Sequence, residues 1–162
     1  MIEVVQRSSY SNTILGWREW VSLPDLGVSW LKAKIDTGAR TSALHAFDIH
    51  EYESPDGPRV RFRVHPWQNN DDDSVEADLA VHDRRMVRSS TGHQQSRIVV
   101  IATVRLLGED VPCEVTLTNR DAMGFRMLIG REALRQRFVV DPARSFMGGR
   151  PERAIRRRNR EG

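Results

Sequence analysis

The sequence KIDTGARTSALHA, residues 34–46, constrains the fold more than any other part of the chain. Every second residue from Leu31 to Ile35 is apolar, and the positions between them are charged, as is Asp36 at the end. This alternation is typical of a half-buried β-strand with an aspartate as its last residue. Gly38 lets the backbone turn sharply and lets other groups approach the carboxylate. The chain therefore presents a carboxylate at the end of a strand, at a tight bend.

A second strand signal lies far downstream. Residues 126–131, Arg-Met-Leu-Ile-Gly-Arg, predict a short apolar strand that ends in Gly-Arg, and residues 132–138 have the pattern of a helix. The Asp-Thr-Gly sequence occurs once, and no internal repeat is visible. Chemistry that needs two such aspartates would therefore have to draw them from two chains.

The rest of the chain predicts β-hairpins separated by turns rich in Gly, Pro and Asp. We expect strands over residues 17–23, 28–36, 49–52, 59–64, 75–81, 98–107 and 111–118, with turns at 24–27, 54–58 and 108–110. Residues 41–47 fit either a strand or a short helical turn. The longest apolar run, residues 98–102, is too short to span a bilayer. Because residues 1–7 also lack the pattern of a signal peptide, we expect a cytoplasmic protein.

Charge divides the chain into two parts. Residues 142–162 contain seven arginines and two glutamates, whereas the first 141 residues carry 18 basic and 20 acidic side chains. The basic excess therefore belongs to the C-terminus, which we expect to be a flexible tail. A solvated end and a contact with RNA or the ribosome both fit such a tail. The one cysteine, Cys113, lies in an apolar segment and is expected to be a buried thiol, not a nucleophile.

The pairing of Asp36-Thr37-Gly38-Ala39 with an apolar strand ending in Gly130-Arg131 and a short helix resembles the retropepsins, the aspartic proteases of retroviral type. The sequence KIDTGARTSALHA, together with Arg88-Ser89-Ser90, Arg97 and Asn119-Arg120, is similar to one bacterial branch. That branch comprises the RimB-like proteins, also named ATP-dependent zinc proteases, which are associated with the glutamate ligase RimK. The resemblance covers residues 14–141.

This resemblance implies an all-β fold, a closed acid-protease β-barrel with one short helix near the C-terminus. The barrel domain would occupy residues 14–141, between an N-terminal extension of residues 1–13 and the basic tail of residues 142–162. Retropepsins also have a mobile flap after the catalytic strand, and we assign residues 51–60 to it.

Aspartic proteolysis requires two carboxylates about 3 Å apart that share one proton. One carboxylate then activates water while the other hydrogen-bonds the carbonyl under attack. Since one chain supplies Asp36 alone, we expect a homodimer in which Asp36 meets its symmetry mate, with Thr37 and Gly38 in the contact. The resemblance implies that the two copies of Thr37 hydrogen-bond across the twofold axis.

Positive charge surrounds the expected site. Retropepsins have apolar residues before the aspartate and an acid two places after the glycine, whereas Lys34 and Arg40 stand in these places here. Both cations favour an ionised carboxylate and attract acidic ligands. The resemblance implies a peptidase that trims α-linked glutamate tails added to a ribosomal protein by a RimK-type ligase. The residues expected to bind such a substrate are Lys34, Arg40, Arg88, Ser89, Ser90, Arg97, Arg120 and Arg131. A surface ion pair is the alternative for each arginine.

No cofactor or metal is predicted. The sequence lacks His-Glu-x-x-His, a cysteine pair and a Gly-rich phosphate loop with Lys-Ser/Thr, and its five histidines are scattered. His45 is the one candidate metal ligand because it follows Asp36 by nine residues. A structural histidine is the alternative.

Two other functions stay open. The same fold and arginines could form a non-catalytic module that binds acidic tails or RNA, or the protein could be a metal-dependent hydrolase. The expected partners are an acidic peptide or glutamylated protein tail and a second copy of the chain, and no membrane is expected.

Overall fold

The computed structural model describes residues 13–67, 73–88, 91–119 and 124–156, and in these residues the chain is mostly β-strand. The strands are β1 (Thr13–Leu15), β2 (Arg18–Leu23), β3 (Val28–Asp36), β4 (Ser42–His45), β5 (Phe47–Ser54), β6 (Gly57–Val64), β7 (Val75–Ala80), β8 (Asp83–Arg88), β9 (Gln94–Leu106), β10 (Glu109–Thr118), β11 (Met127–Gly130) and β12 (Phe138–Val140). The helical parts are short: a 3-10 turn at Pro24–Leu26, α1 (Arg131–Leu134) and one helical turn at residues 153–156. None of these helices is long and apolar enough to cross a membrane.

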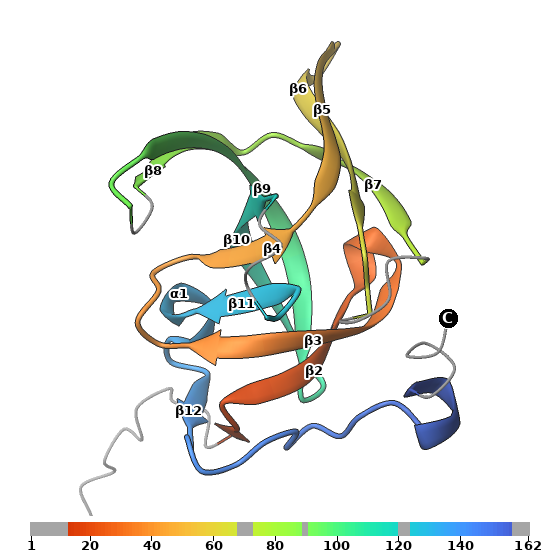
Figure 1. Ribbon diagram of the computed structural model, residues 1–162, viewed down its shortest axis with the longest axis vertical. Helices are drawn as coiled ribbons and strands as arrows, with labels where there is room; N and C mark the ends of the chain where they lie inside the picture. Colours follow the sequence, from red (N-terminus) through yellow and green to blue (C-terminus); the bar gives the residue numbers. More distant parts are fainter. Residues whose placement is uncertain (1–12, 68–72, 89–90, 120–123, 157–162) are drawn as a thin grey trace, which may run out of the picture.

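The largest sheet has the strand order β10-β4-β11-β3-β2-β9-β8, and β9 pairs with β10 as well (Figure 1). β3 lies at its centre, parallel to β11 on one side and antiparallel to β2 on the other. Its alternating apolar residues Leu31, Ala33 and Ile35 are buried in the core. The alternation of apolar and charged residues on β3 thus fixes which face of the strand points to the core, because the apolar face packs inward and the other face carries the charged residues.

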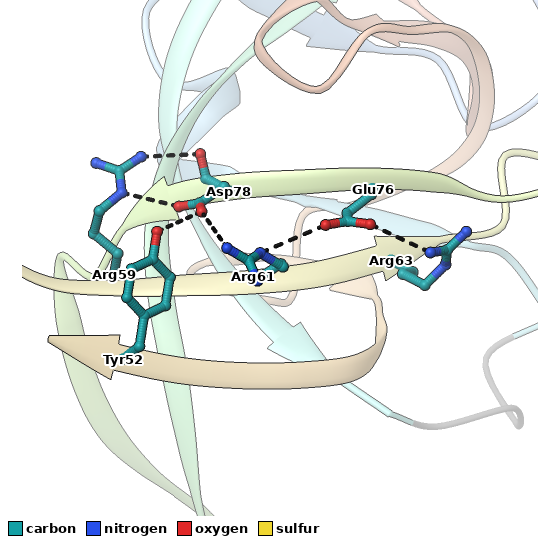
Figure 2. Close-up of polar contacts among 6 residues, drawn as sticks. All are labelled: Tyr52, Arg59, Arg61, Arg63, Glu76 and Asp78. Atoms are coloured by element: carbon teal, nitrogen blue, oxygen red, sulfur yellow. Dashed lines mark hydrogen bonds and ion pairs between the residues drawn. The ribbon is translucent and has the colours of Figure 1, made fainter. Parts of the chain in front are cut away.

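The second sheet consists of β5, β6 and β7, and its β5–β6 hairpin projects at the top of Figure 1. Charged side chains run across the face of this sheet in Figure 2. Tyr52 and Arg59 both hydrogen-bond the Asp78 carboxylate, at 2.5 and 2.9 Å, and Glu76 lies between Arg61 and Arg63. β5 and β6 pair antiparallel up to Ser54 and Gly57, which confirms the hairpin predicted around residues 54–58. The flap role given to residues 51–60 stays a prediction.

The beginning of the expected tail is attached to the main sheet through Glu19. The Glu19 side chain is fully buried and its carboxylate accepts hydrogen bonds from the N–H groups of Gly16, Met147 and Gly148, at 2.7, 3.1 and 3.0 Å. The Phe146 N–H also donates to the Arg18 carbonyl of β2. Residues 144–148 therefore run along β2, whereas we expected a flexible tail from residue 142. Residues 157–162 lie outside the described part.

The all-β class predicted from the sequence is confirmed. The expectation of one short helix is corrected by the helical turn at residues 153–156. The helix predicted over residues 132–138 is shorter than expected, because Arg135 has left the helical region and Gln136 has a φ of 63°. The open assignment of residues 41–47 is settled as a strand, since β4 occupies Ser42–His45.

Candidate functional site

Asp36 is the last residue of β3 and is partly buried. Its Oδ1 accepts hydrogen bonds from the N–H groups of Gly38 (3.0 Å) and Ala39 (3.2 Å), so one oxygen is fixed by the turn. Within the described part of the chain, no donor reaches the other oxygen, Oδ2. A Cβ added at Gly38 would lie 3.3 Å from Oδ1, so glycine leaves room beside the carboxylate. Thr37 and Gly38 are exposed, as a residue that is to contact another molecule must be.

The end of β11 and the start of α1 pack against the turn after Asp36 and donate hydrogen bonds to it. The N–H groups of Arg131 and Glu132 donate to the carbonyls of Ala39 (2.8 Å) and Arg40 (3.1 Å). These are the first N–H groups of α1, which have no acceptor within their own helix. Arg131 also donates from its guanidinium to the Gly38 carbonyl at 3.3 Å. The Gly-Arg sequence predicted to belong to the site therefore supports the turn directly.

Gly130 permits this close packing. A Cβ at Gly130 would lie 2.6 Å from the carbonyl carbon and oxygen of Thr41 and 2.9 Å from the Arg40 oxygen. The Gly130 N–H donates to Ser42 Oγ at 3.1 Å. Only a residue without a side chain can fill this position while β11 stays against the turn.

The outer face of β3 carries Lys32 and Lys34 in line with Asp36, because side chains on a strand alternate between faces. β2 adds Arg18, which is paired with Lys34 in the antiparallel register. Paired residues of neighbouring strands place their side chains on the same face of the sheet. Cations from two strands therefore flank the approach to Asp36 along the sheet.

The structure brings some of the predicted substrate-binding residues together and separates others. Lys34, Arg40 and Arg131 belong to β3, the turn and the start of α1, next to Asp36. The Arg40 guanidinium also lies 3.7 Å from the Glu132 carboxylate, an exposed pair of small energetic value. Arg88 and Arg97 instead belong to the β8–β9 hairpin. Ser89, Ser90 and Arg120 lie outside the described residues.

A pocket of about 280 Å³ lies beside the turn. Its lining residues are Arg40, Thr41, Ser42, Pro112, Cys113, Glu114, Glu132 and Ala133. Burial raises the pKa of the Cys113 thiol to about 11, so the thiol is neutral near pH 7. Cys113 is only partly buried, whereas a buried thiol was expected, and its assignment as a residue that is not a nucleophile stays a prediction. Asp36 does not line this pocket.

His45 lies in β4 and is buried. Its backbone N–H donates to the Arg126 carbonyl at 2.8 Å. Among the described residues, no three His, Cys, Asp or Glu side chains are grouped as metal ligands.

Two residues that support the site were missed by the sequence analysis. Ser42 accepts the Gly130 N–H, and Glu132 pairs with Arg40. A retropepsin acid two places after the glycine is absent here, and Arg131 bonds a backbone carbonyl of the turn in its stead. The run of hydroxyls after Arg40 was the available signal for Ser42. The contact of Glu132 depends on how β11 returns to the turn, which local sequence does not encode.

Three comparisons with known proteins bear on this site. A family model described as RimB-like, retropepsin-like aspartic endopeptidase RimB, matches residues 14–151. Proteins named "Probable alpha-L-glutamate ligase" from Shewanella pealeana and Parasynechococcus marenigrum are 43% and 44% identical over 136 residues, which is 84% of this chain. The chain spans about 30% of the length of these curated relatives. The crystal structure of Lpg0085 from Legionella pneumophila, a protein of unknown function (DUF785), superposes with a TM-score of 0.71 at 30% identity, covering 85% of this chain and 99% of that one.

Proposed function

Because the chain belongs to the RimB-like family of retropepsin-like aspartic endopeptidases, we propose that it is an aspartic-type peptidase that hydrolyses acidic peptides. The substrate class is α-linked glutamate tails of the kind that a RimK-type ligase makes. One observation carries the proposal: the Asp36 carboxylate sits at a braced turn with Oδ1 held by two N–H groups.

The reaction requires a second carboxylate, and we assign it to Asp36 of a second copy of the chain. Two carboxylates about 3 Å apart cannot both be ionised, so they share a proton. The ionised member takes a proton from water, the water oxygen attacks the peptide carbonyl, and the protonated member hydrogen-bonds the carbonyl oxygen. The member that took the proton then gives it to the amide nitrogen, and the C–N bond breaks to release an amine and a carboxylic acid. Thr37 and Gly38, both exposed, would lie in the contact between the copies. The N–H groups on Oδ1 orient the carboxylate for this role.

The cations around Asp36 support an acidic substrate. Lys34, Arg40 and Arg131 come from three segments that meet at the turn. Arginine binds a carboxylate by two parallel hydrogen bonds, which suits a chain of glutamates. Arg88 and Arg97 of the β8–β9 hairpin would act on more distant parts of the substrate.

The ligase name of the relatives describes proteins of which this chain matches about 30%. We propose that the matched segment supplies the peptidase in such proteins, next to a ligase activity elsewhere in their length. A hydrolase that removes what a ligase adds explains why the two would occur together. We also interpret the pairing of β9 with both β2 and β10 as the closure of a retropepsin-like barrel.

Incubation of the protein with synthetic α-linked oligoglutamate, followed by mass spectrometry, tests the proposal. The wild-type protein is expected to release shorter glutamate chains, and Asp36→Asn is expected to release none. The asparagine keeps an oxygen that accepts the N–H groups of Gly38 and Ala39, so the turn survives. Asp48→Asn is the matched control because Asp48 is exposed in β5 and lies outside the residues assigned to the flap.

Three outcomes decide between the functions. Cleavage by Asp36→Asn at the wild-type rate would remove Asp36 from the mechanism. Binding of oligoglutamate without any product would favour the non-catalytic module. Loss of wild-type activity with a chelator, restored by zinc, would favour the metal-dependent hydrolase.

A further inference from the structure

A cleft rich in positive charge lies on the outer face of β2 and β3, away from the turn pocket. Its volume is about 220 Å³, and its lining residues are Arg18, Trp20, Lys32, Phe146, Arg150 and Arg156. Four of these six residues are cations and none is acidic. We call this site the cationic cleft. A cluster of like charges attracts anions.

Aromatic rings contact three of the four cations of the cleft, namely Arg18, Lys32 and Arg150. The Arg18 guanidinium lies 4.6 Å from the centre of the Trp17 ring and 4.7 Å from that of Phe146. Lys32 Nζ lies 5.7 Å from the Phe146 ring, and Arg150 lies 5.9 Å from the same ring. Such contacts stabilise cations by the negative face of the ring, without neutralising their charge. The ring contacts therefore hold Arg18 and Arg150 at the cleft as charged groups.

The C-terminal segment forms one wall of the cleft and is fixed by buried contacts. Glu19 accepts hydrogen bonds from Met147 and Gly148, next to Phe146. Arg18 also donates from Nε to Ser145 Oγ at 3.1 Å. Residues of β2, β3 and the C-terminal segment are thus fixed relative to one another by hydrogen bonds, and the cleft has a defined shape.

The cleft lies on the same face of the sheet as Asp36. Lys32 and Asp36 are on the same face of β3, with Lys34 between them, and Arg18 is paired with Lys34. At about 3.3 Å per residue, Lys32 is about 13 Å along the strand from Asp36. An extended peptide covers that distance in about four residues. Cations at Lys34 and Arg18 continue the path between the two ends.

We propose that the cationic cleft is a distal subsite that binds the carboxylates of an acidic peptide about four residues from the bond cleaved at Asp36. This inference rests on the proposed function for the identity of the ligand. A distal subsite makes binding depend on the length of the peptide, because a short peptide bound at Asp36 does not reach the cleft. Longer glutamate chains would then bind more tightly and be cut in preference.

Binding by the full chain carrying Asp36→Asn tests the cleft separately from catalysis. Competition with a fluorescent acidic peptide gives the Kd of oligoglutamates of two, four, six and eight residues. We expect the Kd to fall between two and six residues. Adding Arg150→Gln should weaken binding of the six-residue chain by about tenfold, the loss of one charge-assisted hydrogen bond, and leave the two-residue chain unchanged. Lys32→Gln should do the same.

Arg153→Gln is the matched control, because Arg153 is an exposed arginine of the same C-terminal segment that does not line the cleft. Both variants remove one positive charge, so a general effect of net charge would weaken binding equally in both. Equal weakening, or a Kd independent of length, would overturn the proposal. Tighter binding of single-stranded RNA of the same charge, lost with Arg150→Gln, would also overturn it and assign the cleft to nucleic acid.

Cleavage kinetics of variants that keep Asp36 distinguish this inference from the peptidase proposal. Arg150→Gln should raise KM for six-residue chains with kcat unchanged. If no chain is cleaved but the length-dependent binding and its loss in Arg150→Gln persist, the peptidase proposal fails and the cleft stands. If cleavage occurs with equal KM in Arg150→Gln and Arg153→Gln, the cleft proposal fails alone.

Discussion

At the scale of single residues, Gly130 controls how closely β11 approaches the turn that carries Asp36. Gly130→Ala would place a Cβ 2.6 Å from the Thr41 carbonyl, so the two backbones must separate. We expect a loss of about 1–3 kcal/mol in the free energy of unfolding, typical of overpacking. Urea denaturation measures this loss, and the oligoglutamate assay should show a further loss of activity because the turn shifts.

Gly108→Ala provides the comparison for this prediction. Gly108 has a φ of +79° but an added Cβ would have no neighbour within 4 Å, so the substitution strains the backbone without a clash. It should lower stability and leave peptide cleavage by the folded protein unchanged. A Gly130→Ala protein with wild-type activity would show that the turn tolerates the displacement.

The local part of the site was predictable at this scale, and its supports were not. Alternation up to Asp36 and the glycine after it are local properties, and the structure has the strand and turn where they were expected. The bond from Arg131 to the Gly38 carbonyl depends on two segments that lie far apart in the sequence. The cationic cleft was missed for the same reason, since residues 142–162 were treated as a tail.

At the scale of elements, the β5–β6–β7 sheet is held on its outer face by Asp78. The Tyr52 hydroxyl, and then Arg59, lower the pKa of the Asp78 carboxyl below its usual value. A lowered pKa means that the ionised form stabilises the fold above about pH 4, and that this stabilisation is lost as the pH falls through the folded-state pKa. Asp78→Asn should therefore lower Tm at pH 7 and make less difference at pH 3.

Thermal melts between pH 3 and pH 7, followed by circular dichroism, measure this dependence. Asp56→Asn serves as the control, since Asp56 is exposed in the turn of the same sheet. Its Tm should equal that of the wild type at each pH. A difference between wild type and Asp78→Asn that stays constant over the range would contradict the assigned role of the ionised carboxylate.

Strands with one apolar face were predictable from the sequence, and strands without such a face were not. β3 has the predicted bounds, and β6 and β10 begin only two residues before the strands expected at residues 59 and 111. β8 was not among the expected strands because its residues are mostly charged and exposed, and its pairing with β9 holds it in the sheet. β1 and β12 are short strands that depend on each other, from opposite ends of the described chain.

At the scale of the whole molecule, the proposed chemistry makes two chains necessary for one active site. Wild-type and Asp36→Asn chains mixed in equal amounts and allowed to exchange should show about a quarter of the activity of the same total amount of wild type, because both copies must carry the carboxylate. The measurement is the rate of oligoglutamate cleavage at fixed total protein. Independent active chains would give about half, and that result would exclude a shared site.

Both faces of β3 are needed, so the number of residues in this strand is fixed. Its inward side chains are part of the core, and its outward side chains are Asp36 and the lysines beside it. Inserting or deleting one residue in this strand would send the lysines into the interior and turn the carboxylate away from its surroundings. Point changes can alter which acidic chains are preferred, but descendants of this gene must conserve the length of β3 if they are to keep both a folded molecule and its chemistry.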